Sequence, residues 1–212
     1  KKILKIFYEH KVNYIAILDH FTSIYDRFNL KNKIYLPEQI WVFDKIIYER
    51  LNKKIKKITR LKTNYYLRIF KNLKKKKRRF IVYFTEPFNK IKKNRNSEDY
   101  YSMKYFLDNI YKLKKFIKNK VLIKLHPKHS ENYIENLLGT EIKKIGAKIV
   151  NYNLEKLLPI IKYSFGLTTY AIILTSKLKI KTFHCKLSKQ KINLINDYKI
   201  LSFQDYLKNQ NV

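Results

Sequence analysis

Short apolar runs that alternate with helix-like segments constrain the fold of this chain more than any other feature. From Phe80 onward these runs are apolar with little polar alternation, as in strands that are buried on both faces. The predicted strands are 80–84, 121–125, 148–150, 160–165 and 181–185. Strands of this kind that alternate with helices predict a parallel sheet with helices on both faces, as in a Rossmann-like α/β fold.

Helix signals occupy the gaps between these strands. Asn96-Ser97-Glu98-Asp99 is typical of a helix start, and apolar residues then recur at helical spacing to about Asn119. Further helices are predicted at 133–138, stopped by Gly139, at 154–158, capped by Asn153, at 168–178, and after a capping box that begins at Ser202. We therefore assign residues 80–212 to one Rossmann-like domain.

The first 79 residues predict a second α/β region. Val12–Leu18 and Gln39–Phe43 are predicted strands, and Asp44 is positioned to cap a helix that runs to Leu51. The lysine-dense stretch 53–79 is interpreted as the end of this region and a linker. Because the chain opens at Lys1 inside a helix-like segment, we expect residues 1–79 to be the C-terminal part of a larger N-terminal domain.

Composition excludes several functional classes. Three glycines, with no GxxxxGK[ST] or GxGxxG motif, argue against P-loop NTPases and typical NAD or FAD enzymes. A single cysteine, Cys185, excludes an internal disulfide framework and a multi-cysteine zinc site. No run reaches the roughly 18–20 apolar residues of a membrane-spanning helix, and no signal-peptide pattern is present. We expect a cytoplasmic protein with no bound metal.

The formal charge of +32 points to anionic partners. However, 41 of the 48 basic residues are lysine, whereas dedicated nucleic-acid binders tend to use arginine for bidentate contacts. A solvated lysine surface is the simpler interpretation, and a nucleic-acid partner is not expected. Peripheral association with an anionic membrane remains open, because it requires only charge.

Polar residues follow the predicted strands where a parallel sheet binds its ligands, at the carboxyl ends. Gly166 permits a close turn, and Thr168 and Thr169 offer hydroxyl donors beside the free N–H groups of the next helix, an arrangement that suits phosphate. The structural alternative is that Thr168 only caps this helix.

Other strand ends carry further candidates. His126-Pro127 combines a hydrogen-bond donor with a strand break, although a histidine there can also be purely structural. Glu86 is a candidate for a ribose or sugar hydroxyl, or alternatively a helix-capping or solvated acid. His184 is a candidate lining residue, His129 is expected on the surface, and Cys185 is expected in the core.

Asp19 follows the first predicted strand and is the candidate general base. The alternative is an ion pair between Asp19 and Arg27 or a lysine.

Together, His126-Pro127 and the Gly-Leu-Thr-Thr turn at 166–169 resemble the motifs of GT-B glycosyltransferases. The chain is most similar to bacterial sialyltransferases and polysialyltransferases and to capsule and teichoic-acid polymer transferases, which share a His-Pro motif and a later Ser/Thr pair. In those enzymes the motifs hold a cytidine nucleotide and its phosphate. The segments ILDHFTSIYDRF and LPEQIWVFD also resemble the end of the family's N-terminal domain.

The resemblance implies a metal-independent transfer of a sugar, such as a sialic-acid-like sugar from a CMP donor, to a glycan or lipid-linked acceptor. The nucleotide-sugar donor is then a substrate rather than a cofactor. His126 and the Thr168–Thr169 helix start would stabilise the leaving phosphate, and Asp19 would deprotonate the acceptor. A CDP-polyol phosphate transferase and a basic nucleic-acid or membrane-surface module remain alternatives.

Overall fold

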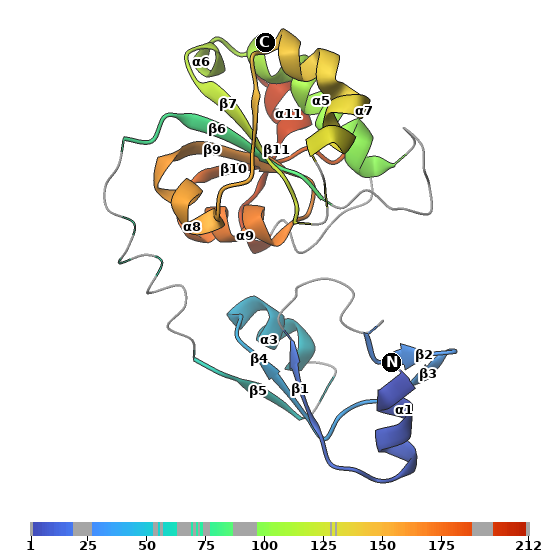
Figure 1. The fold of residues 1–212 in the computed structure, drawn as a ribbon. Helices are drawn as coiled ribbons and strands as arrows, with labels where there is room; N and C mark the ends of the chain where they lie inside the picture. The colour runs from blue at the N-terminus through green and yellow to red at the C-terminus, as the bar shows by residue number, and fades with distance from the viewer. Residues whose placement is uncertain are drawn as a thin grey trace. The chain divides into compact units, whose positions relative to one another are not determined.

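A computed structural model of the chain describes residues 2–18, 27–52, 55, 57–62, 69, 71, 73, 77–86, 97–127, 129, 131–187 and 197–210. The chain forms two compact units, Lys1–Arg68 and Ile69–Val212 (Figure 1). The boundary predicted from the sequence lies somewhat later, after Arg79.

Unit 1 contains a small parallel sheet. Its elements are α1 (Lys2–Glu9), β1 (Ile15–Leu18), β2 (Asn29–Leu30), β3 (Lys33–Ile34), β4 (Gln39–Val42), α3 (Lys45–Asn52) and β5 (Ile58–Arg60). Strands β1, β4 and β5 pair in that order, all parallel, and β2 and β3 form an antiparallel hairpin. The predicted strands 12–18 and 39–43 correspond to β1 and β4. Strand β5, which was not predicted, lies in the stretch interpreted as the end of this region and a linker.

One face of this sheet is buried and the other is open. Leu18, Ile40 and Val42 are buried, and α3 contributes the buried Ile47 and Leu51. Asp44 Oδ1 accepts hydrogen bonds from the N–H groups of Ile46 (2.8 Å) and Ile47 (3.1 Å), which confirms the predicted cap. On the opposite face, Ile15 and Ile17 of β1 are about half exposed.

Unit 2 is a larger α/β structure. Its strands are β6 (Phe80–Phe84), β7 (Lys120–Lys124), β8 (Lys148–Val150), β9 (Ile161–Gly166), β10 (Lys181–His184) and β11 (Leu201–Ser202). Its helices are α5 (Glu98–Asn109), η1 (Ile110–Lys112), α6 (Lys114–Ile117), α7 (Glu131–Lys144), α8 (Leu154–Leu157), η2 (Leu158–Ile160), α9 (Tyr170–Lys177) and α11 (Phe203–Lys208). The strand positions agree closely with the prediction, and β11 was missed.

The six strands pair in the order β11-β10-β9-β6-β7-β8, and every pair is parallel. Counted along the chain from β6, this is the order 3-2-1-4-5-6 of the doubly wound Rossmann fold. Helices α5, α6, α7 and α11 lie on one face of the sheet, and α8 and α9 lie on the other (Figure 1). The predicted parallel sheet with helices on both faces is thus confirmed.

Aromatic side chains fill the core on the α5 face. Phe106 of α5, Phe165 of β9, Phe183 of β10 and Phe203 of α11 are all fully buried. Phe165 and Phe183 stack with ring centroids 4.9 Å apart, and Phe203 meets Phe165 edge-on at 5.0 Å. Cys185, at the end of β10, is buried in the same cluster as expected.

The α9 face contains a buried hydroxyl network. Thr175 of α9 donates to Ser164 Oγ of β9 (2.9 Å) and lies 3.1 Å from Thr182 Oγ1 of β10. All three side chains are buried, and the hydroxyls of Thr175 and Thr182 also contact the backbone carbonyls of Ile172 (3.0 Å) and Ile180 (2.8 Å), so every hydroxyl is paired. The network holds α9 against β9 and β10, and thereby fixes the turn that precedes the helix.

Two helix predictions in unit 2 were only partly correct. The helix predicted to stop at Gly139 is interrupted there, because the backbone has non-helical angles at Leu138 (φ −136°, ψ 19°), but a second helical stretch follows and α7 as a whole ends at Lys144. The helix predicted to reach Asn119 ends at Asn109, and η1 and α6 follow as separate short helices. None of the helices in the described part of the chain is both long and apolar enough to cross a membrane.

Candidate functional site

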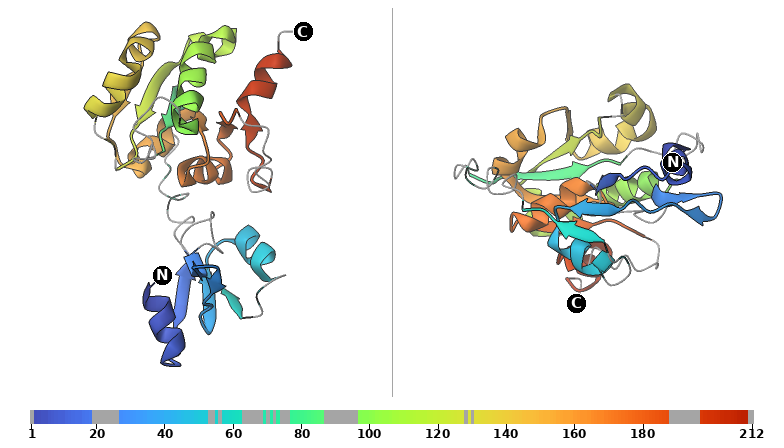
Figure 2. Two further views of the ribbon diagram at one scale, coloured as in Figure 1. Left: turned by 90° about the vertical axis from the view of Figure 1, so that its right-hand side faces the viewer. Right: turned by 90° about the horizontal axis from the view of Figure 1, so that it is seen from below.

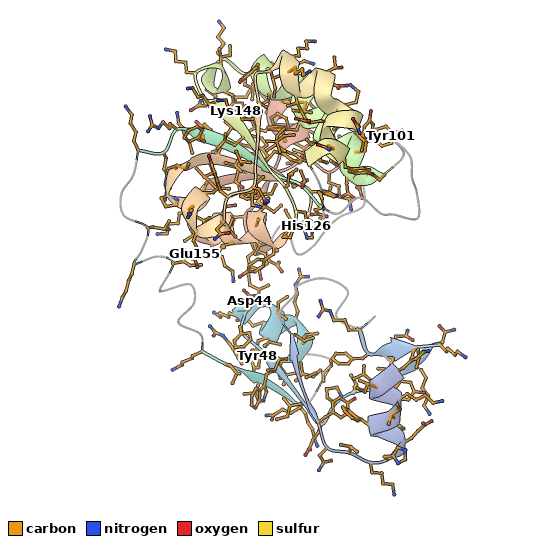
Figure 3. The ribbon with its side chains drawn as sticks, in the orientation of Figure 1. Asp44, Tyr48, Tyr101, His126, Lys148 and Glu155 are labelled. Atoms are coloured by element: carbon orange, nitrogen blue, oxygen red, sulfur yellow. The ribbon has the colours of Figure 1, made fainter. Side chains whose placement is uncertain are left out.

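The strand order of unit 2 reverses between β6 and β9. The chain proceeds outward from β6 to β8 on one side, then returns and proceeds from β9 to β11 on the other. Parallel sheets of this type bind ligands at that switch point, outside the carboxyl ends of the strands. Glu86 follows β6, His126 follows the neighbouring β7 and Thr168 follows β9, so three predicted site residues come together at this edge. Figure 3 labels His126 at the end of β7.

Glu86 and Thr168 bridge the switch point. The backbone N–H of Thr168 donates to Glu86 Oε1, and the Thr168 hydroxyl donates to Glu86 Oε2 at 3.1 Å. The carboxylate of Glu86 therefore occupies donors that were predicted to bind phosphate. Thr168 does not cap the following helix. Instead it couples the end of β9 to the end of β6.

Burial raises the pKa of Glu86, the hydrogen bonds from Thr168 oppose this shift, and the nearby carboxylates of Asp99 and Glu98 add to it, so that the pKa is about 7. Burial also raises the pKa of Asp99, with Glu98 adding to the effect, to about 6. Glu86 is thus close to half protonated at neutral pH. A carboxyl group in that state can accept a hydrogen bond or donate one.

Thr85 organises the neighbouring strand end. Its side chain is buried, and its Oγ1 accepts a hydrogen bond from the His126 backbone N–H at 2.8 Å. The same oxygen lies 3.2 Å from His129 Nδ1. The His126 carbonyl accepts from the His129 N–H at 2.9 Å, which closes the turn at the exposed Pro127. Thr85, which directly precedes Glu86 in the sequence, therefore contacts both His126 and His129.

His129 was expected on the surface, but it is half buried and its ring lies 6.2 Å from that of His126. Burial lowers the pKa of His129, and the neighbouring His126 lowers it further. A neutral imidazole can accept from the Thr85 hydroxyl at Nδ1 and keep its proton on Nε2 as a donor. No sequence signal distinguished His129 from a surface histidine, because the contact joins residues 44 positions apart.

Gly166 is required for space rather than for its backbone angles. A Cβ at this position would lie 2.8 Å from Ile172 Cγ2 and 3.1 Å from the Phe84 carbonyl oxygen. Its φ is not positive, so the predicted reason, a tight turn, was wrong. Phe84 pairs in register with Gly166, and Glu86 and Thr168 each lie two residues further along the chain.

Thr169 is the residue that caps α9. Its Oγ1 accepts from the Ala171 N–H at 3.2 Å, and its backbone is extended, as N-cap residues are. The Thr169 hydroxyl proton is not used in this contact and can be donated to a ligand oxygen. The structural alternative considered for Thr168 therefore applies to Thr169.

The other candidate residues lie either at the edge of the site or outside the part of the chain that the structure describes. His184, at the end of β10, pairs in register with Gly166, and its Nδ1 is buried with no hydrogen-bond partner. Burial lowers the pKa of His184. Asp19, the candidate general base, and Pro87 lie outside the described residues, so the structure does not bear on them.

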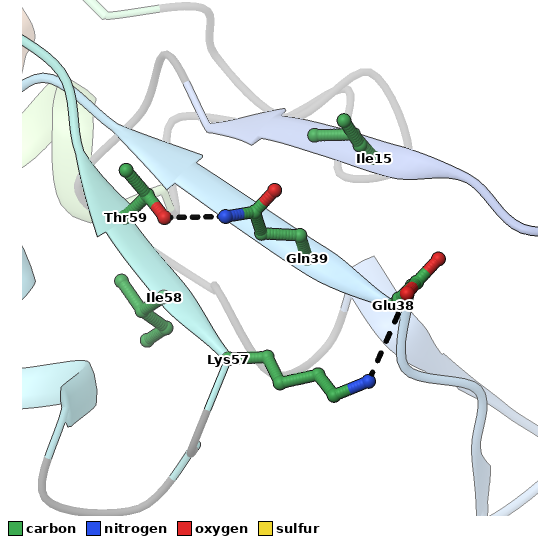
Figure 4. Close-up of a pocket in the computed structure, with 6 residues that line it drawn as sticks. All are labelled: Ile15, Glu38, Gln39, Lys57, Ile58 and Thr59. Atoms are coloured by element: carbon green, nitrogen blue, oxygen red, sulfur yellow. Dashed lines mark hydrogen bonds and ion pairs between the residues drawn. The ribbon is translucent and has the colours of Figure 1, made fainter.

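A separate open pocket of about 460 Å³ lies in unit 1 (Figure 4). Gln39 Nε2 donates to Thr59 Oγ1 within it, and Lys57 and Glu38 form an ion pair at 3.9 Å. Ile15, Gln39 and Ile58, which also line it, are the first residues of their strands. The pocket thus lies at the amino ends of a parallel sheet, opposite the edge where such sheets bind ligands.

Comparisons with known proteins give no family for this chain. No family model matches, and no curated protein matches. Among solved structures, the chain is weakly similar to (E)-4-hydroxy-3-methyl-but-2-enyl diphosphate reductase, with 12% identity, a TM-score of 0.25, and coverage of 99% of this chain and 90% of that one. A likeness of this size carries no argument about fold or function.

Proposed function

We propose that this chain is a glycosyltransferase that uses a nucleotide-activated sugar, and that unit 2 is its donor-binding domain. The observation that carries the proposal is the Glu86–Thr168 bridge at the point where the Rossmann strand order reverses. Nucleotides bind at this place in doubly wound sheets. The glycines of a dinucleotide fingerprint are absent, and side chains supply the polar groups instead.

The polar groups at this edge match the two parts of a nucleotide. The carboxyl group of Glu86 suits the hydroxyls of a ribose or sugar. The Thr169 hydroxyl and an imidazole N–H suit phosphate oxygens. In a transfer reaction, the bond between the anomeric carbon and the donor phosphate oxygen breaks, and the phosphate leaves with the bonding electrons. Donors at the start of α9 and on His126 would stabilise that charge.

The two-unit organisation is compatible with a GT-B enzyme, because each unit contains a parallel sheet with a helix-covered face. The family resemblance further favours a cytidine nucleotide, a sialic-acid-like sugar, a glycan or lipid-linked acceptor, and Asp19 as the base. These finer assignments are part of the proposal. So is the alternative of a CDP-polyol phosphate transferase, which would place the same cytidine and phosphate groups at this edge.

Thermal-shift measurements with CMP, CDP, UDP and GDP test the donor site. We expect a cytidine nucleotide to raise the melting temperature of the wild-type protein, and His126→Ala to reduce that shift. His10→Ala, which removes an exposed histidine of unit 1, is the matched control and should not change it. If no nucleotide stabilises the wild-type protein, the proposed function is wrong.

The donor that is consumed distinguishes a glycosyltransferase from a CDP-polyol phosphate transferase. A sialyl-type reaction consumes a CMP-sugar and a polyol phosphate transfer consumes a CDP-polyol, and both release CMP. Incubation with each donor, followed by chromatography of the nucleotide products, identifies which one is used. A basic nucleic-acid module would instead bind random DNA with a steep dependence on salt and would use neither donor.

A further inference from the structure

Two side chains at the end of strand β10 are not used in the proposed function. His184 is the last residue of β10, and Lys186 follows two residues later. Both residues therefore lie at the carboxyl edge of the parallel sheet, where this fold binds its ligands. Their surroundings set them apart from the surface lysines and histidines of the chain.

Lys186 is far more enclosed than the other ion-paired lysines. Its side chain is 9% exposed, whereas the lysines of the other ion pairs among the described residues are between 38% and 67% exposed. Its Nζ lies 3.9 Å from Oε1 of Glu98, which is a long distance for such a pair. Because a buried ammonium group requires close anionic partners, Lys186 has the capacity to hold a nearer one.

Glu98 can give up this contact at little cost. Its side chain is 44% exposed, so water can solvate the carboxylate when the ammonium turns to another anion. Glu98 and Asp99 also make the first turn of α5 acidic, which opposes the binding of an anion at the start of that helix. The first turn of α9 has no acidic residue. An anion at this edge is therefore favoured on the side of β9 and β10.

The direction of His184 follows from the alternation of side chains along β10. Phe183 enters the aromatic core on the α5 face, and Thr182 joins the hydroxyl network on the α9 face. Figures 1 and 2 show α5 and α9 on opposite faces of the sheet. His184, like Thr182, thus faces α9. It pairs in register with Gly166, where an added Cβ would lie 3.2 Å from Thr169 Cγ2, so His184 and Thr169 flank the same glycine.

The His184 imidazole has one nitrogen for a ligand. Its Nδ1 is buried and has no hydrogen-bond partner among the described residues. Burial lowers the pKa of His184, Asp205 partly opposes this effect, and the Lys186 ammonium lowers the pKa further, so the ring is neutral at neutral pH. The single ring proton is then best placed on Nε2, where solvent or a ligand can accept it.

We propose that Lys186 and His184 form an oxyanion subsite at the end of β10, next to the Thr169 hydroxyl. The ammonium of Lys186 supplies the charge, and the Nε2–H of His184 supplies a directed donor. The ligand is an oxyanion, either a phosphate or a carboxylate. In the proposed transferase it is the phosphate of the donor or the carboxylate of an acidic donor sugar, and this part of the inference rests on the proposed function.

Calorimetric titration at fixed low salt tests the subsite. The probes are inorganic pyrophosphate, uncharged cytidine, CMP and CMP-N-acetylneuraminic acid. Lys186→Met and His184→Phe are the test variants. Lys148→Met is the matched control, because it removes the same charge from an exposed residue at the amino end of β8. Thermal melting verifies that each variant folds.

We expect Lys186→Met and His184→Phe to bind pyrophosphate about tenfold more weakly than the wild-type protein and Lys148→Met do, because each loses a hydrogen bond to a charged group. Cytidine should bind equally to all four proteins. A loss that already appears with CMP assigns the subsite to phosphate, and a loss confined to CMP-N-acetylneuraminic acid among the nucleotides assigns it to the sugar carboxylate. Equal affinities of Lys186→Met and Lys148→Met for every anion would overturn the proposal.

Glu98→Gln separates ligand binding from a purely structural role of Lys186. This variant removes the present partner of the ammonium and should bind pyrophosphate at least as tightly as the wild-type protein. Weaker binding would mean that the ion pair is needed rather than the ammonium, and would also overturn the proposal.

The two proposals fail in different ways. If the wild-type protein binds pyrophosphate but no nucleotide, and Lys186→Met loses that binding, the subsite is supported and the proposed transferase is wrong. If CMP and the sugar nucleotide bind Lys186→Met and the wild-type protein equally well, the donor site is supported and the subsite is wrong.

Discussion

Glu86 and Thr168, 82 residues apart in the sequence, are joined by two hydrogen bonds across the strands where the sheet of unit 2 reverses its order. The carboxyl group receives both the backbone N–H and the hydroxyl of Thr168. This contact connects the ends of β6 and β9, and it decides which donors remain for a ligand. Thr168 is committed to Glu86 in the structure described, whereas the Thr169 hydroxyl keeps a proton to donate.

Glu86→Gln is expected to flatten the dependence of stability on pH. Between an unfolded pKa near 4.5 and a folded pKa of about 7, the folded state keeps a proton that the unfolded state has released. Stability therefore falls as the pH rises through this window, and the loss reaches about 3 kcal/mol above pH 7. Glutamine has no such loss, and its amide can both accept and donate to Thr168. Urea denaturation measures the free energy of unfolding at pH 5 and pH 8. Relative to the wild-type protein, the variant should be more stable at pH 8 than it is at pH 5.

Asp108→Asn is the control for this experiment. Asp108 is an exposed carboxylate of α5 that pairs with Lys104 at 3.0 Å, on the helix that also carries Asp99. Its removal should leave the pH dependence close to that of the wild-type protein. An equal pH dependence in Glu86→Gln and wild type would mean that Glu86 titrates normally in the folded state.

Thr85→Val is expected to destabilise unit 2. Valine keeps the shape of the buried side chain but removes the acceptor of the His126 N–H and the partner of His129 Nδ1. Loss of such a buried hydrogen bond costs about 1–3 kcal/mol. Thr85→Ser retains the hydroxyl and should cost less. Chemical denaturation measures both, and equal losses in the two variants would assign the effect to packing rather than to the hydroxyl.

Gly166→Ala should be destabilising, although alanine is usually tolerated. The added Cβ would meet Ile172 Cγ2 at 2.8 Å and a backbone oxygen at 3.1 Å, so β6 or α9 must shift, at a cost of about 1–3 kcal/mol. Gly139→Ala on α7 has open space around it and should be neutral or stabilising by up to about 1 kcal/mol. The melting temperatures of the two variants test this prediction. An unchanged melting temperature for Gly166→Ala would contradict the close contacts around Gly166.

Thr169→Ala is expected to weaken the start of α9. The Ala171 N–H loses its acceptor, and loss of an N-cap of this kind costs about 0.5–2 kcal/mol. Thr169→Ser preserves the cap and serves as the control. Thermal unfolding gives the comparison, and equal melting temperatures for alanine and serine would show that the cap contributes nothing measurable.

The strands of unit 2 were predictable from sequence because their apolar runs are short and bounded by polar residues. Phe80–Phe84 was predicted with its observed bounds, and the runs that became β7 and β9 were placed within one residue. The errors in the helix predictions also arise at single positions. Gly139 marks the break at Leu138, but it gives no sign of the second helical stretch that follows, which contributes the buried Ile142 to the core and ends at Lys144.

The site was predictable as a set of residues but not as a set of contacts. Strand ends in a parallel sheet marked Glu86, His126 and the turn at Gly166–Thr169. The sequence does not contain the pairing that makes Glu86 the partner of Thr168, or the buried hydroxyl of Thr85 that connects His126 with His129. Thr85 and His129 therefore received no particular weight.

The sequence by itself determined the class of this protein: apolar runs buried on both faces require a parallel sheet with helices on each side. Only the tertiary structure decided which strands are neighbours. The order of the strands follows from crossover connections and from packing between distant segments, such as Phe165 against Phe183 and Phe203, which no local pattern encodes. That order places β6 next to β9, and so turns Glu86 and Thr168 into one site.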